Sequence, residues 1–327
     1  MSTSEVRLVL LGTAGGPLPS PVRSGIAQAV VAGDRVYLVD CGSGVTRQLR
    51  RAKLLKNLHA VFLTHLHSDH DCDYFNLFLL GWPILQWNPA VSVYGPGRAG
   101  RLPDDCDPAE TGAAAPVVSP ENPTPGLADL TRLQIDAHAY DLNVRMRETG
   151  RADLTKLIDT HEIELPPDAH ARHNGARPST PIPVFADDRV RVTAVLVNHG
   201  PVFPSFAFRF DTDSGAIVIS GDTAPCAGLI SLASGADVLV HEVYDDTGTT
   251  DRGGDGSRES RLRDRHLLDA HTPLSRVGEV ASRARVRRLV LTHFIPGDDV
   301  LPDEHWVRGA AFDGEVIVGR DLAEVAL

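Results

Sequence analysis

Three histidines and an aspartate fall within six consecutive positions of this chain, at His65, His67, Asp69 and His70. They directly follow the apolar run 60–63, which predicts a short buried strand. Imidazole nitrogens and carboxylate oxygens are ligands of zinc and its first-row neighbours. Packing gives no reason for so many imidazoles in one stretch, so the pattern predicts a metal site.

Five further segments place a possible ligand or an acid–base residue directly after an apolar run or in a turn. Any one of them is a weak signal, since single histidines and aspartates are common at strand ends. Strand ends project side chains into a shared rim, so we expect these residues to converge. The residues concerned are His199, Asp222, His241, Glu242, His271 and His293.

Composition limits the class of protein. The chain has 327 residues, 42% of them hydrophobic, which is enough for a large core. A net charge of −11 gives no general attraction for nucleic acid, because that binding depends on Lys and Arg. The four cysteines are scattered with no CxxC pair, which argues against a cysteine zinc site and indicates free thiols.

The order of predicted elements indicates an α/β fold. Short strands are expected before residue 64 and again after residue 190, with helices at 45–55, 74–81 and 275–284. We expect one domain over 1–327 that carries an insertion at about 97–187, with two helical stretches inside 127–158. The Gly-rich segment 247–265 predicts a surface loop. No stretch has the roughly 20 apolar residues of a membrane span, and the start lacks a secretory signal, so the expectation is a soluble cytoplasmic protein.

These segments resemble the metallo-β-lactamase superfamily, and most of all its ribonuclease Z branch, which also includes arylsulfatase-like and phosphodiesterase members. The resemblance implies a four-layer αβ/βα sandwich with the site on one edge. The matching pieces run in the family's order along nearly the whole chain: Leu11-Gly12-Thr13, Val39-Asp40-Cys41-Gly42, the segment 65–70, His199-Gly200, Pro204-Ser205-Phe206, Ser220-Gly221-Asp222-Thr223, Pro225-Cys226, Gly235-Ala236-Asp237, His241-Glu242, His271-Thr272 and Thr292-His293.

The resemblance also implies a ligand set for two divalent metal ions. It places His65, His67 and His199 on one ion, Asp69, His70 and His293 on the second, and Asp222 between both. Nitrogen and oxygen ligands that leave positions open for water suit a catalytic site. Two ions roughly 3.5–4 Å apart can lower the pKa of a shared water towards about 7 and hold the oxygens of a displacement. Zinc is the first expectation, with manganese or iron as alternatives.

A second pair of residues bears on the reaction. In the ribonuclease Z branch the residues that match Glu242 and His271 form a dyad near the scissile phosphate. With Asp69 they are the predicted catalytic residues: Glu242 orients His271, which stabilises transition-state charge or protonates the leaving oxygen. The alternative is that His271 is an N-terminal helix residue and Glu242 a surface acid. We expect His241 on the opposite strand face, and Asp40 and Thr64 as hydrogen-bond partners of ligand imidazoles.

Charge bears on the substrate. The stretch 127–160 has five basic and six acidic residues, which does not favour a phosphate backbone, although Arg172, Arg177 and the cluster 258–265 weaken this argument. The stretch is therefore interpreted as a lid or a dimer contact, with a homodimer expected as in the family. Phe203 and Phe206, or aromatic residues after the histidine cluster, are candidate walls of an apolar substrate pocket.

The sequence as a whole favours a dinuclear metal-dependent hydrolase of a small ester, with a phosphodiester as first choice. An arylsulfatase or lactonase on the same site is the alternative, because the same activated water can attack sulfur or a carbonyl carbon. A tRNA 3′-processing endonuclease has lower weight, and a non-catalytic metal-binding scaffold is the alternative outside enzymes.

Overall fold

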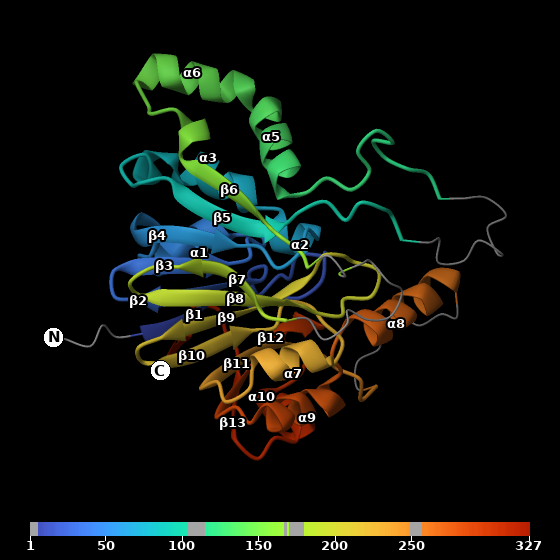
Figure 1. Cartoon of the computed structure of the whole chain (residues 1–327). Coiled ribbons are helices and arrows are strands. Elements are labelled where there is room, and N and C mark those ends of the chain that lie inside the picture. Colours follow the sequence, from blue (N-terminus) through green and yellow to red (C-terminus); the bar gives the residue numbers. More distant parts are fainter. Residues whose placement is uncertain (1–5, 104–114, 167–168, 170–179, 249–256) are drawn as a thin grey trace.

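Two β-sheets packed face to face, with helices on their outer faces, form the protein (Figure 1). The computed structural model describes residues 6–103, 115–166, 169, 180–248 and 257–327. Each sheet has seven strands. This four-layer arrangement confirms the predicted α/β sandwich.

The first sheet has the strand order β14-β1-β2-β3-β4-β5-β6. Its strands from β3 to β6 run parallel, so their carboxyl ends share one edge. The bounds are β1 Val6–Gly12, β2 Ala27–Ala32, β3 Arg35–Val39, β4 Leu58–Phe62, β5 Val91–Pro96, β6 Ile158–Ile163 and β14 Glu324–Ala326.

The second sheet has the order β13-β12-β11-β10-β9-β8-β7. Strands β10 to β13 are parallel, and β7 to β10 pair antiparallel. The bounds are β7 Ile182–Ala186, β8 Val190–Leu196, β9 Phe206–Thr212, β10 Gly215–Ile219, β11 Val238–Tyr244, β12 Arg288–Ile295 and β13 Glu315–Val318.

Helices pack on the outside of both sheets, and α8 extends away from the sandwich (Figure 1). The α-helices are α1 Val45–Arg51, α2 Ser68–Asp71, α3 Tyr74–Leu85, α5 Leu127–Ala137, α6 Ala139–Thr149, α7 Ala227–Leu232, α8 Arg258–Ala270, α9 Leu274–Ala284 and α10 Asp303–Ala310. Two short 3-10 helices, η1 and η2, lie at Leu55–Asn57 and Leu154–Lys156. No helix in these described ranges is long and apolar enough to cross a bilayer.

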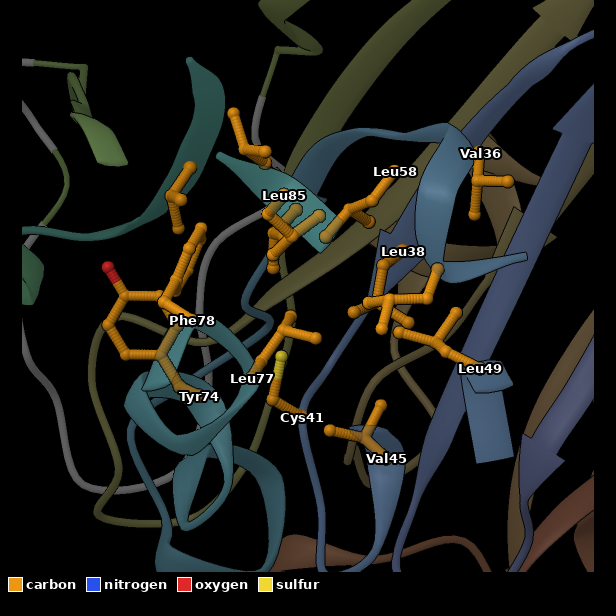
Figure 2. Packing of buried hydrophobic residues seen from close by; sticks show 14 of the residues in the cluster. Val36, Leu38, Cys41, Val45, Leu49, Leu58, Tyr74, Leu77, Phe78 and Leu85 are labelled. Carbon is orange, nitrogen blue, oxygen red and sulfur yellow. The ribbon is translucent and has the colours of Figure 1, made fainter. Parts of the chain in front are cut away.

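Strands that are apolar at every position are buried on both faces. In β3, Val36 and Leu38 point outward into a hydrophobic cluster that also contains Leu49 of α1 and Phe78 of α3 (Figure 2). The alternate residues of β3 point inward between the sheets, because successive side chains of a strand face opposite ways. This double burial fixes the register of β3 and its neighbours.

Several predicted elements are confirmed and one is wrong. The two helical stretches inside 127–158 are α5 and α6, while the helix predicted at 45–55 ends at Arg51 and the helix predicted at 74–81 continues to Leu85. The loop predicted over 247–265 is wrong from residue 258 onward, because Arg258 begins α8 and the Ser257 hydroxyl caps it by accepting from the Ser260 N–H. The glycines that suggested a loop lie outside the described residues. The single domain with an insertion at 97–187 stays a prediction.

One carboxylate ties the two sheets together. Asp187, between β7 and β8, accepts a hydrogen bond from the Tyr37 hydroxyl at 2.6 Å and from the Arg35 guanidinium at 2.7 Å, both on β3. It also accepts from the backbone N–H groups of Arg189 and Val190. Burial opposes its charge, but these donors outweigh burial and hold the pKa of Asp187 below its usual range.

We expect Asp187→Ala to lower the free energy of unfolding by about 2 kcal/mol at pH 7, because it leaves the buried Tyr37 hydroxyl unpaired. The matched control is Asp188→Ala, whose carboxylate is 67% exposed, with a loss under about 0.5 kcal/mol. The lowered pKa makes the Asp187 contribution complete above pH of about 4 and lost as the pH falls through the folded value. Urea unfolding of both variants at pH 7 and at a pH below about 4 measures the loss of free energy of unfolding and its pH dependence. Equal losses in the two variants at pH 7 would contradict the assignment.

Candidate metal centre and active site

Three imidazoles from the two sheets form the first cluster. His65 and His67 lie in the loop after β4, and His199 follows β8. His67 Nδ1 is 3.2 Å from His199 Nε2, and the His65 and His199 ring centroids are 4.6 Å apart. One ligand atom from each residue lies within 4.8 Å of the others, close enough for a single ion.

Two carboxylates and two imidazoles form the second cluster. Asp69 and His70 lie on α2, Asp222 follows β10, and His293 lies in β12. Asp222 Oδ2 is 3.3 Å from Nε2 of both His70 and His293, and 3.9 Å from His199 Nε2 in the first cluster. The structure thus brings together all seven residues of the predicted ligand set, with Asp222 between the two groups.

Unusual backbone conformations aim two of these side chains. His293 is the extra residue where the register of β11 and β12 shifts, and its φ is +46°. A bulge of this kind turns a side chain out of the strand's regular alternation. Gly221, with φ of +57°, precedes Asp222, and a Cβ there would lie 2.6 Å from the Phe206 carbonyl oxygen. Only glycine therefore fits this turn.

A layer of hydrogen bonds orients the rings. His70 Nδ1 donates to Asp40 at 2.8 Å, and His199 Nδ1 donates to the Ala270 carbonyl at 3.0 Å. The Thr64 hydroxyl lies 3.0 Å from His65 Nδ1 and also bonds Asp40. These contacts confirm Asp40 and Thr64 as the expected partners, and they leave the Nε2 atoms of His65, His70 and His199 for the clusters.

The electrostatics suit metal binding. Burial lowers the pKa of His65 and His199 well below the usual range, so both imidazoles are neutral and can offer a lone pair. Burial opposes the charge of Asp222, but His293 and His70 outweigh it and hold its pKa low, so the carboxylate is ionised. Within the described ranges, His65 Nε2 and Asp222 Oδ1 are buried and make no hydrogen bond. Buried polar atoms of this kind, aimed into a nitrogen and oxygen donor set, fit divalent metal ions.

The predicted dyad is present beside the second cluster. His271 Nδ1 is 2.8 Å from Glu242 Oε2, and Glu242 Oε1 accepts from the Thr223 N–H. Burial opposes a charged His271, but the charge of Glu242 and this hydrogen bond raise the pKa of His271 to about 9. Glu242 is 1% exposed, so the alternative of a surface acid is wrong, and His271 lies just past α8 at the end of that helix.

Sequence reasoning assigned no role to His266, which the structure brings to the same site. Its ring centroid is 5.3 Å from that of His271 and 5.9 Å from that of His199. It was missed because no motif includes it and the preceding segment 247–265 was predicted as a loop. In the structure, His266 lies on α8 five residues before His271, and the helix carries it to the site. His241 is fully buried beside the Glu242 carbonyl, as expected for a core residue.

A cavity of about 380 Å³ opens beside His67. Phe203, from the loop after β8, is one of its walls, whereas Phe206 is buried in the core between the sheets. Most aromatic residues after the histidine cluster are also core, and Trp87 is 81% exposed outside the cavity. Of the predicted wall residues, Phe203 is thus the one in the cavity lining.

Comparison with known proteins agrees with the fold and the site. A profile described as the metallo-beta-lactamase superfamily matches residues 23–140. The chain is 34% identical over 328 residues to ribonuclease Z of Mycobacterium avium (strain 104), covering 98% of both proteins, and 32% identical to ribonuclease Z of Mycobacterium bovis (strain BCG / Pasteur 1173P2), with the same coverage.

Two solved structures share the fold along their whole length. The metallo-beta-lactamase fold protein YhfI from Bacillus subtilis has a TM-score of 0.62 at 19% identity, covering 98% of this chain and 99% of that one. The short form of human tRNase Z has a TM-score of 0.61 at 21% identity, covering 98% of each chain. The chain belongs to the metallo-beta-lactamase superfamily, in the branch that holds these ribonuclease Z relatives. It is a hydrolase of that family, whose members use divalent metals.

We expect zinc-loaded protein to hold about two ions per chain after gel filtration, because the donors form two groups that share Asp222. Asp222→Ala should lower this below one ion, since it removes the carboxylate between the groups, and metal analysis by mass spectrometry measures it. The matched control is Asp211→Ala, a 38%-exposed carboxylate on β9, which should keep the full content. Wild-type protein that holds no metal would contradict the site.

Proposed function

We propose that the protein is a metal-dependent phosphodiester hydrolase. The observation that supports this most directly is the buried Glu242–His271 pair, with His271 Nδ1 at 3.9 Å from Asp222. In this proposal His65, His67 and His199 would hold one ion, Asp69, His70 and His293 would hold a second, and Asp222 lies between the two groups. Bound divalent ions would lower the pKa of a water ligand and offset phosphate charge.

The chain's own residues supply orientation and proton transfer. Glu242 holds Nδ1 of His271, so Nε2 is the nitrogen that can donate a proton to the leaving oxygen. The raised pKa of His271 keeps this ring protonated at neutral pH, as an acid of this kind requires. Asp69, whose side chain is 11% exposed at the rim, is the carboxylate that orients the attacking water. The His266 ring centroid is 5.3 Å from that of His271, so in this proposal His266 can assist at the departing group.

Two substrate classes compete. The relatives named ribonuclease Z favour an RNA phosphodiester. Against a strong grip on RNA, two of the three arginines of α5 and α6 pair with carboxylates on their own helix: Arg132 with Asp136, and Arg145 with Asp141. An exposed helix pair of this kind offers little to a phosphate backbone. We therefore propose a small phosphodiester as the substrate, with RNA as the second candidate.

A panel on metal-loaded protein tests this choice. It comprises bis-nitrophenyl phosphate, nitrophenyl sulfate, a simple lactone, nitrocefin and a precursor tRNA, each with and without chelator. We expect chelator-sensitive cleavage of the phosphodiester at the highest kcat/KM. Efficient 3′-end cleavage of the tRNA would move RNA to first place, and activity confined to the sulfate or lactone would overturn the phosphodiesterase proposal.

We expect His271→Ala to lower kcat at least about 100-fold for an alkyl or phenyl leaving group while metal content stays unchanged. The loss should be much smaller for a nitrophenolate leaving group, which departs without protonation. His161→Ala, an exposed imidazole on β6, is the matched control and should keep full activity. Equal losses for both leaving groups would rule out the acid role, and a collapse of metal content would make His271 a ligand.

A further inference from the structure

We infer that the cavity beside His67 binds an apolar, ring-sized group that is esterified to the reacting phosphate. This inference rests on the proposed hydrolase function and names its substrate class more closely. It places an uncharged aryl or alkyl part of a small ester in the cavity while the phosphate lies against the metal ligands.

The position of the cavity couples it to the reaction. Leu66 and His67 form one wall, and His67 Nδ1 is 3.2 Å from His199 Nε2 in the first cluster. The rest of the lining comes from both halves of the fold. Residues from 96–103 and 124–125 belong to the N-terminal half, and the loop 201–204 belongs to the C-terminal half. A group in this cavity can therefore contact His67, which is the proposed metal ligand in the lining.

The lining is built to hold apolar surface. Five of the fourteen described residues in the lining are prolines, which offer no backbone N–H: Pro96, Pro103, Pro125, Pro201 and Pro204. Leu66, Leu102, Val202 and Phe203 add aliphatic and aromatic surface. Among the described residues of the lining, Arg101 is the one basic or acidic side chain besides the imidazole of His67, and it is exposed.

Size and polarity separate the possible occupants. The volume of about 380 Å³ lies in the range of small-molecule sites, roughly 300–1,000 Å³, and exceeds the roughly 150 Å³ that holds one benzene ring. A nucleobase site needs donors and acceptors for the base edges. Among the described lining residues, the polar side chains are those of His67, Arg101 and Thr124, the Thr124 oxygen accepts from the Gly100 N–H, and the prolines supply no N–H. The observations thus favour an aryl or alkyl group over a base.

Leu102 gives a variant that changes the cavity without touching the proposed ligands. Its side chain is at the rim and 42% exposed, so Leu102→Glu places a carboxylate in the cavity with little risk to folding. Leu102→Gln makes the same change without a charge. The matched control is Leu133→Glu on α5, where the leucine is 47% exposed and outside the cavity.

The experiment measures calorimetric affinity of zinc-loaded protein for methyl-, phenyl- and 1-naphthylphosphonate, and for a phosphonate analogue of adenosine 5′-monophosphate. We expect affinity to rise at least about tenfold from methyl to phenyl and again to naphthyl, because each ring buries apolar surface. Leu102→Glu and Leu102→Gln should remove most of this gain and leave methylphosphonate within about threefold. Leu133→Glu should keep the gain.

Three results would overturn the inference: equal affinity across the ring series, an equal loss in Leu133→Glu, or tighter binding of the adenosine analogue than of naphthylphosphonate. The last result would make the cavity a base site. Because these are binding measurements, they are separate from the proposed function, which is read from chelator-sensitive turnover of bis-nitrophenyl phosphate. Turnover without a ring effect refutes the cavity assignment alone.

Discussion

The buried carboxylate of Asp222 is the interaction on which the site depends. An isolated ionised carboxylate in a protein interior costs several kcal/mol, so it persists only with close partners of opposite or variable charge. Asp222 is 2% exposed, and imidazoles from both sheets surround it, with His70 and His293 at 3.3 Å. No one element supplies these neighbours. The carboxylate therefore ties the packing of the two sheets to the chemistry at their common edge.

Local backbone geometry converts this shared edge into a site. Regular strands would alternate their side chains between two faces, yet His293 and Asp40 both adopt positive φ at points where the regular pattern breaks. His293 turns towards Asp222, and Asp40 turns towards His70 and Thr64. Conformations of this kind cost about 1–3 kcal/mol each and persist only where the surroundings fix them. Here the hydrogen bonds of Asp40 and the tight β11–β12 pairing do so.

The candidate site and the helices α5 and α6 differ in their polar groups. At the site, buried imidazoles and carboxylates lie beside an apolar cavity, whereas α5 and α6 carry exposed charges that pair within each helix. The chain is similar to ribonuclease Z proteins along its whole length, and this similarity alone does not distinguish an RNA substrate from a small one. The residues of the site bear on the reaction, whereas the surface and the cavity bear on the size of the substrate. Our proposal assigns phosphodiester hydrolysis to the centre, and it takes the paired surface charges and the apolar cavity as support for a small substrate.

The sequence alone determined the donor types and the fold class. Three histidines and an aspartate within six residues, with further candidates after apolar runs or in a turn, are local patterns that reflect ligand chemistry and strand burial directly. Only the tertiary structure decided which strand-end residues meet. His241 and Glu242 are neighbours in β11, yet one is a core residue and the other holds His271. His266 and the cavity beside His67 were out of reach for the same reason: they depend on how α8 and three distant loops pack, and such contacts leave no periodic signal in the chain.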